Sequence, residues 1–211
     1  MKIVKQKAKL EDFLWRNEQD LLKSIEKIAR VCYKSEEKIT KDSAKTMITF
    51  LKENGHLSIF EHFNLTARFI TNRGVTHELV RHRIAEYSQE STRYCNYSLE
   101  KFGNQISVIL PVWFEKINIG IVQHYNVWVA AMKASESYYF QLLDLGQKPQ
   151  QARGVLPIDL KTEIITTMNL RQWWHVFNLR LDLKSHPQMI ALMNQWYSIL
   201  HGELPFLFPT I

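Results

Sequence analysis

Two similar stretches of the chain each join an alternating run to a helical pattern, and this pairing constrains the fold more than any other feature. Phe63–Thr71 alternates as a strand with one buried face does, and Asn72 offers an N-cap to a helix over Gly74–Ile84. Leu160–Met168 is rich in isoleucine and threonine, and Asn169–Asp182 has helical spacing. Each unit predicts a strand that leads directly into a helix.

Other elements are predicted around these units in no regular order. Helices are expected over Asp20–Ser35, Asp42–Asn54, Gly120–Leu145 and from His186-Pro187 to about His201-Gly202, strands over Ser91–Ser98 and Gln105–Leu110, and a loop with one helical turn over Pro149–Pro157. Strands and helices that do not alternate favour an α+β domain over a doubly wound sheet.

Length and composition predict one domain over residues 1–211. Hydrophobic residues make up 45% of the chain, enough for a substantial core, and no serine- or glycine-rich linker or internal repeat divides it. The N-terminal stretch lacks the apolar segment of a secretory signal, and no run approaches the roughly 20 apolar residues of a membrane span. We therefore expect a soluble protein without a membrane partner.

The two cysteines point to a reducing compartment. Cys32 and Cys95 form neither a disulfide framework nor a zinc pattern, which suits the cytoplasm. Cys32 lies among apolar helical residues, so we expect it in the core.

The formal net charge of +6 and the pI near 9.2 favour anionic partners. Nucleic acid and phosphorylated metabolites both meet that description. Much of the excess is ordinary surface lysine before residue 55, whereas the later half of the chain places arginine in compact polar motifs. The position of the positive residues must decide between the two kinds of partner.

The densest polar group runs from Arg81 to Tyr94. It holds three arginines and a histidine, and such charges cannot be buried without partners. A solvated helix end with an ion-paired loop is the ordinary explanation. Alternation beyond Ser91 would place Ser91, Arg93 and Cys95 on one side of a strand, which favours a ligand site. Arginine suits phosphate, because its planar fork binds phosphate oxygens bidentately.

Four ordered motifs resemble the flavin-dependent thymidylate synthase family. They are Arg81-His82-Arg83 followed after seven residues by Ser91, His56-Leu57-Ser58-Ile59-Phe60-Glu61-His62, Ala152-Arg153-Gly154-Val155-Leu156-Pro157, and Asn169-Leu170-Arg171 with His175 and Asn178-Leu179-Arg180. Together they span roughly residues 50 to 181. The first fifty residues, Val112–Tyr125 and the last helix add little to the match.

The resemblance implies a central, mostly antiparallel sheet flanked by helices, assembled as a homotetramer with sites shared between subunits. It implies conversion of dUMP to dTMP with a one-carbon unit from 5,10-methylenetetrahydrofolate and hydride from NADPH through FAD. Hydride transfer belongs to the flavin, and the protein stacks and orients the rings.

Residue roles follow from the same resemblance. The cofactor FAD would be held by His56, Ser58, Glu61, Arg81, His82, Arg83, Gln89, Asn169, Arg171 and His175. The substrate dUMP would be held by Glu78, Arg81, Gln89, Glu90, Ser91, Thr92, Arg93, Arg153 and Arg180. Many family members have Glu-Gln before the signature serine, whereas this chain has Gln89-Glu90.

The residues themselves are compatible with these roles. On the second helix Arg171, His175 and Asn178 share one face, whereas Arg180 turns partly away and could reach another ligand. An arginine beside the uracil edge favours the ionised ring, so Arg180 is the candidate catalytic residue. Classical thymidylate synthases attack the pyrimidine with a cysteine in a Pro-Cys-His setting. Neither Cys32 nor Cys95 has proline or histidine beside it, so this comparison argues against covalent catalysis by cysteine.

Parts of the sequence also suggest two other classes of protein. His77-Glu78 and His82 suggest a zinc protease, but the second histidine falls at i+5 where the motif needs i+4, so no metal site is expected. A nucleic-acid-binding protein is the runner-up, because aromatics and arginine interleave in Arg171-Gln172-Trp173-Trp174-His175. Those aromatics fall at helical core spacing, and we expect no nucleic-acid partner.

Overall fold

A four-stranded antiparallel sheet forms the centre of the protein. The computed structural model describes residues 1–12, 15, 17–116 and 120–210. The strand order is β2 (Lys7–Asp12), β3 (Asn64–Asn72), β6 (Lys161–Asn169) and β4 (Glu86–Gln89). The two long strands, β3 and β6, pair along their whole length, from Asn64 opposite Asn169 to Asn72 opposite Lys161. An antiparallel sheet flanked by helices confirms the predicted α+β class.

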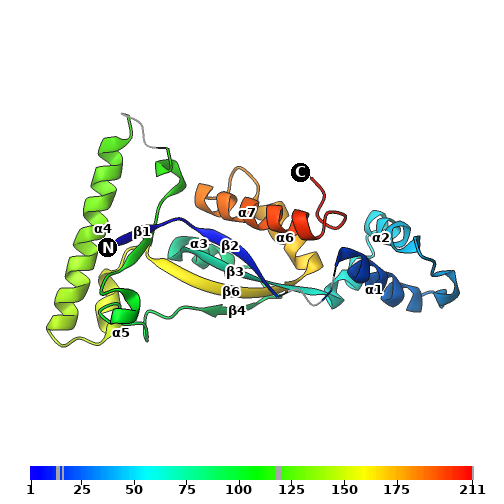
Figure 1. The fold of residues 1–211 in the computed structure, drawn as a ribbon, viewed down its shortest axis with the longest axis horizontal. Coiled ribbons are helices and arrows are strands. Elements are labelled where there is room, and N and C mark those ends of the chain that lie inside the picture. Colours follow the sequence, from blue (N-terminus) through cyan, green and yellow to red (C-terminus); the bar gives the residue numbers. More distant parts are fainter. Residues whose placement is uncertain (13–14, 16, 117–119, 211) are drawn as a thin grey trace.

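Seven helices are found in the described residues. They are α1 (Glu18–Val31), α2 (Ser43–Glu53), α3 (Arg73–Leu79), α4 (Val122–Asp144), α5 (Pro149–Ala152), α6 (Leu170–Arg180) and α7 (Pro187–Glu203). Short 3₁₀ segments are η1 (Glu36–Lys38), η2 (Leu57–His62), η3 (Glu100–Phe102), η4 (Val112–Phe114) and η5 (Arg153–Val155). Figure 1 shows the α1–α2 pair at one end of the molecule and α4 at the other, with the sheet between them.

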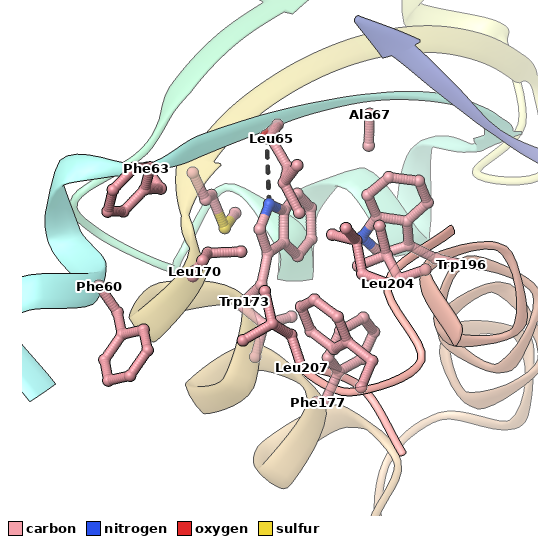
Figure 2. Close-up of a cluster of buried hydrophobic side chains, with 14 of the residues drawn as sticks. Phe60, Phe63, Leu65, Ala67, Leu170, Trp173, Phe177, Trp196, Leu204 and Leu207 are labelled. Carbon is pink, nitrogen blue, oxygen red and sulfur yellow. Dashed lines mark hydrogen bonds between the residues drawn. The ribbon is translucent and has the colours of Figure 1, made fainter. Parts of the chain in front are cut away.

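The main core lies between the sheet and helices α6 and α7. Trp173 on α6 and Trp196 on α7 are fully buried, with ring centroids 5.3 Å apart, and both rings meet Phe69 of β3 edge-on. Trp173 Nε1 donates to the carbonyl of Leu65, 3.2 Å away, so its one polar group is satisfied inside the core (Figure 2). This packing holds α6 rigidly against β3.

Most of the predicted helices and strands are present with small shifts in their ends. The expected helices over Asp20–Ser35, Asp42–Asn54, Gly120–Leu145 and from His186-Pro187 correspond to α1, α2, α4 and α7, and the strand expected over Gln105–Leu110 contains β5 (Ser107–Ile109). Gly55 follows the second helix with a φ of 70°, as expected of a helix stop. Residues 117–119 of the segment Val112–Tyr125 lie outside the described residues.

Two N-terminal strands were not predicted from the sequence. β1 (Lys2–Val4) pairs in parallel with β5, and β2 forms an edge of the main sheet. β1 has only three residues, too few for an alternation to be recognised. Their partners lie about 60 to 100 positions later in the chain.

Three expectations were wrong. The helix predicted to reach Ile84 ends at Leu79, where the chain turns toward β4. Ser91–Ser98 is not a strand, because the carbonyl of Ser91 accepts from the N–H groups of Tyr94 and Cys95 and closes local turns. Cys32 is exposed rather than in the core, since it follows the last residue of α1.

None of the helices built from the described residues is both long enough and apolar enough to span a bilayer.

Candidate functional site

The two strand–helix units begin their helices in the same way. Asn72 Oδ1 accepts from the N–H of Val75, and Asn169 Oδ1 accepts from the N–H of Gln172, each at 2.8 Å. Both are side-chain N-caps that satisfy an otherwise unpaired helix donor. Because β3 and β6 are antiparallel partners, their two helices start from opposite ends of the sheet's central pair of strands.

The turn after α3 carries an unfavourable backbone conformation. Ile84 has a φ of 65°, a left-handed value that β-branched residues rarely adopt. Tyr87 supports the turn, since its hydroxyl lies 2.9 Å from the carbonyl oxygens of both Leu79 and His82. Burial raises the pKa of Tyr87 to about 12, so the hydroxyl keeps its proton. Strain of this kind persists at functional sites where the surroundings hold it in place.

The ends of the two units meet at Arg180. Arg180 Nε donates to His82 Nε2 at 2.8 Å, Nη1 donates to Glu78 Oε2 at 2.8 Å, and Nη2 donates to the Glu78 carbonyl at 3.2 Å. A guanidinium has five N–H donors, so these bonds leave one on each terminal nitrogen for a ligand. Glu78 and His82, assigned to ligands by the resemblance, both hold Arg180 in the structure.

His82 is held in its neutral form. Burial lowers its pKa to about 4, and the positive charge of Arg180 and the neighbouring His175 add to the shift. The ring lies 6.2 Å from that of His175, edge-on. Neutral His82 can therefore accept the hydrogen bond from Arg180, which a protonated ring could not.

Two adjoining hollows lie beside this network. The hollow next to Arg180 measures about 360 Å³, and the other about 320 Å³. The first is lined by Arg81, His82, Arg83, Ile84, Gln172, His175, Leu179 and Arg180, and the second by Glu61, Ile84, Asn169, Arg171, Gln172 and His175. Three residues belong to both, so the two hollows form one continuous arginine-lined surface.

The charges of this surface are mainly positive. Arg171 forms an ion pair with Glu61 at 2.6 Å, with both side chains about half exposed. Arg81 and Arg83 are exposed and have no ion pair within the part of the chain that the structure describes. The guanidinium groups of Arg171 and Arg180 are held by partners, and guanidinium groups suit the oxygens of a phosphate.

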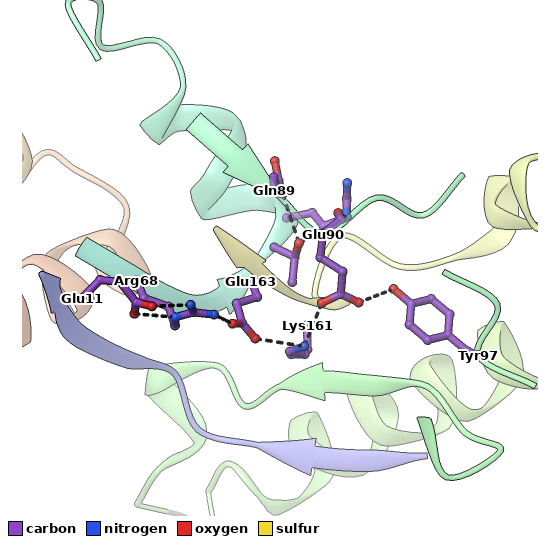
Figure 3. Close-up of polar contacts among 9 residues, drawn as sticks. Glu11, Arg68, Gln89, Glu90, Tyr97, Lys161 and Glu163 are labelled. Carbon is purple, nitrogen blue, oxygen red and sulfur yellow. Dashed lines mark hydrogen bonds and ion pairs between the residues drawn. The ribbon is translucent and has the colours of Figure 1, made fainter. Parts of the chain in front are cut away.

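Gln89 and Glu90 lie in a different place from the hollows. Gln89 Nε2 donates to the hydroxyls of Thr76 and Thr162, at 2.9 and 3.2 Å. Glu90 accepts from Tyr97 at 3.0 Å and from Lys161 at 2.8 Å, as Figure 3 shows. The figure also shows the ion pairs of Arg68 with Glu11 and Glu163 on the same face of the sheet.

The remaining sequence-predicted residues lie outside the two hollows. Arg153 donates to the Thr92 hydroxyl at 3.2 Å, and Arg93 lies over the ring of Tyr94, 5.4 Å from its centroid. Ser91 Oγ accepts from the N–H of Arg93, so Ser91 serves the local turn. His56, Ser58, Ser91, Thr92, Arg93 and Arg153 line neither hollow.

Several residues of the site were not predicted. Ile84 and Gln172 line both hollows, and Lys161 and Tyr97 bind Glu90. The position of Gln172 between Arg171 and the predicted His175 was the only available signal for it. Asn178, expected on the face of Arg171 and His175, lines another pocket with Trp174 and Tyr197, because it lies two turns further along α6.

The two tryptophans that suggested a nucleic-acid-binding protein have partners within the fold. Trp173 is in the core, and the ring N–H of Trp174 donates to the carbonyl of Leu207. Among the residues described, no three or more histidine, cysteine, aspartate or glutamate side chains gather as metal ligands would.

Fold and site together define an α+β protein with an arginine-lined surface. The model of the thymidylate synthase complementing protein family matches residues 14–206. The chain belongs to this family.

Relatives with known names agree with this assignment. A flavin-dependent thymidylate synthase of Geobacter sulfurreducens is 31% identical over 187 residues, 85% of this chain and 77% of that protein. The enzyme of the same name from Pyrococcus abyssi is 36% identical over 69% of this chain, which spans 57% of that protein's length. A third, from a Mycobacterium species, is 33% identical over 83% of this chain and 75% of its own length.

Proposed function

We propose that the chain is a flavin-dependent thymidylate synthase, an enzyme of the methyltransferase type that forms dTMP from dUMP. Family membership supports the class of reaction. The observation that carries the proposal for this chain is Arg180, which is held by Glu78 and neutral His82 with two N–H donors left over. We propose one domain over residues 1–211, acting in the cytoplasm.

The hollow beside Arg171 would hold part of FAD. Its lining supplies the Arg171 guanidinium, the Gln172 amide and the Asn169 amide, a donor set that suits the phosphate oxygens of a dinucleotide. The amide nitrogen of Asn169 has no hydrogen-bond partner within the described residues, whereas its oxygen caps α6. When bound, FAD would pass hydride from NADPH to the one-carbon unit that 5,10-methylenetetrahydrofolate supplies.

Arg180 would act on dUMP in the adjoining hollow. Its two free N–H groups would bind a carbonyl oxygen of the uracil, and the positive charge would favour the ionised ring. Neutral His82 and the Glu78 carboxylate keep the guanidinium in place, so little ordering remains to be done when substrate binds. Arg81 and Arg83 line the same hollow and would share the negative charge of the ligands.

In a homotetramer with shared sites, residues of a neighbouring subunit would complete the arginine-lined surface. Arg93 and Arg153, assigned to dUMP by the family resemblance, line neither hollow of their own chain. They would reach dUMP in a site of a neighbouring subunit. The same applies to Ser91 and Thr92, which directly precede Arg93 in the chain.

One assay tests the reaction. Purified protein is incubated with dUMP, and dTMP is measured with reduced flavin and 5,10-methylenetetrahydrofolate supplied together or singly. Product is expected only when both are present. Product that forms without flavin, or no product under any of the conditions, would contradict the proposal.

A mixing experiment tests the shared site. Arg153→Ala and Arg180→Ala chains are each expected to be inactive alone. If the two arginines serve one site from different subunits, mixed tetramers contain some intact sites and recover part of the activity. No recovery after verified subunit exchange would place both residues in the same subunit's site.

A further inference from the structure

A separate cavity lies where the two sheets meet. Its volume is about 540 Å³, within the range of small-molecule sites. Strands β1, β2, β3, β5 and β6 line it together with the segment 97–105. Glu90 is the one residue it shares with the predicted nucleotide-binding set, and it shares none with the two arginine-lined hollows.

Lysine dominates the lining of this cavity. We call the set Lys2, Lys5, Lys7, Lys101 and Lys161 the lysine basin. The first three belong to the lysines that composition assigned to ordinary surface. The fold brings them together with Lys101 and Lys161, which lie about 95 and 155 positions further along the chain.

The charge of the basin is not neutralised by the protein. Glu90 is the only carboxylate in the lining, and both of its oxygens are taken, by Tyr97 and Lys161 (Figure 3). Lys2, Lys7 and Lys101 have no ion pair in the described part of the chain. Lys5 has only a 3.9 Å contact with the exposed Glu115, and Lys161 lies 4.0 Å from Glu163, which is outside the lining. Five positive charges against one negative charge leave four positive charges around one cavity.

The kind of cation indicates the kind of ligand. Lysine carries a compact charge on a flexible stem and imposes no planar geometry, unlike the arginines of the hollows. A set of lysines therefore selects for the number of negative charges more than for their arrangement. Ile70, Tyr97 and Phe102 add an apolar wall on which the body of a ligand can pack.

We propose that the lysine basin binds a small polyanion, a molecule with several closely spaced phosphate or carboxylate groups. This site is distinct from the arginine-lined hollows and does not depend on the function proposed for them. Attraction between several charges predicts that binding weakens steeply as salt is added.

Calorimetric titration of the flavin-loaded protein with inorganic tripolyphosphate at low salt tests the site. One saturable site per chain is expected. The double variant Lys7→Gln/Lys101→Gln should weaken binding by about tenfold or more, because two charged contacts are lost. The control Lys27→Gln/Lys41→Gln changes the net charge equally at exposed positions outside the basin, and should change affinity by less than about twofold.

A single substitution that removes a negative charge, instead of positive ones, sharpens the test. Glu90→Gln removes the only carboxylate of the lining and leaves Lys161 with only its 4.0 Å contact to Glu163, so tripolyphosphate should bind about threefold tighter or more. Weaker binding in this variant would overturn the proposal.

A second titration, with a short oligoglutamate, distinguishes the two sources of charge. Tighter binding of tripolyphosphate assigns the site to phosphate compounds, and tighter binding of oligoglutamate assigns it to carboxylate chains. Absence of saturable binding by either probe, or equal weakening in the basin and control variants, would overturn the proposal.

Discussion

The two strand–helix units begin alike and end differently. Both have an asparagine N-cap with a 2.8 Å bond, but the amide of Asn72 donates to Asp159 at 2.8 Å, whereas the amide of Asn169 faces a hollow without a partner in the described residues. α3 stops after seven residues in a strained turn, whereas α6 continues for eleven and is anchored by Trp173. The first unit supplies charged side chains on the turn after α3. The second unit supplies a rigid helix, α6, which positions Arg180 against that turn.

The largest expected effect is at the end of the second unit. Arg180→Ala should lower the rate of dTMP formation by about 100-fold or more, because a preorganised donor to the reacting ring is lost. Arg180→Lys should remain impaired, because an ammonium cannot replace the three directed bonds to His82 and Glu78. Circular dichroism should show an unchanged fold. Lys184→Ala, at an exposed cation shortly after α6, is the matched control and should keep normal turnover.

The pH dependence of stability tests the end of the first unit. Folded His82 stays neutral down to about pH 4, whereas the unfolded chain takes up that proton near 6.5. The unfolded state therefore binds more protons between these values, and the free energy of unfolding falls as pH falls through the window. Between pH 7 and pH 5 the free energy of unfolding should fall by about 2 kcal/mol more in the wild type than in His82→Gln. Urea unfolding at the two pH values measures this difference. Equal losses in both proteins would refute the neutral, buried histidine.

Matched substitutions of the two N-cap residues, Asn72 and Asn169, should have different effects on the stability of the fold and on flavin binding. Asn72→Asp keeps the capping oxygen but places a second carboxylate against Asp159, so unfolding free energy should fall by about 1–2 kcal/mol with flavin affinity unchanged. Asn169→Asp keeps its cap and should change stability by less than about 0.5 kcal/mol, yet weaken flavin binding by about tenfold. Flavin fluorescence titration and urea unfolding measure the two effects. The same pattern in both variants would mean that the caps do not differ in function.

The smallest effect is expected at the strained turn. Ile84→Gly should raise the free energy of unfolding by up to about 1 kcal/mol, because glycine adopts a positive φ without steric cost and Ile84 is 74% exposed. Flavin affinity should fall, since Ile84 lines both hollows. A loss of stability would show that the turn is not strained.

Local features of the fold could be predicted because their physical causes are local. A cap acts over three residues and an amphipathic helix over a few turns, so Asn72, Asn169 and the helices around them are recognisable in the sequence. The failed strand over Ser91–Ser98 has a local cause as well. Ser91 binds nearby N–H groups with both its carbonyl and its hydroxyl, which favours turns over a ladder.

The candidate site could be predicted only in part. The arginine motifs and the family resemblance named most of the residues that line the hollows, namely Glu61, Arg81, His82, Arg83, Asn169, Arg171, His175 and Arg180, but not Ile84, Gln172 or Leu179. Ile84 drew no attention because its role comes from a backbone conformation that an isoleucine side chain does not suggest.

By itself the sequence determined the residue types, the two capped strand–helix units and the family. Tertiary structure alone decided that His82 is neutral, that it binds Arg180 from 98 positions away, and that lysines from distant parts of the chain surround one cavity. The physical reason is that protonation and hydrogen bonding depend on burial and on neighbours in space, and these exist only once distant segments have packed together.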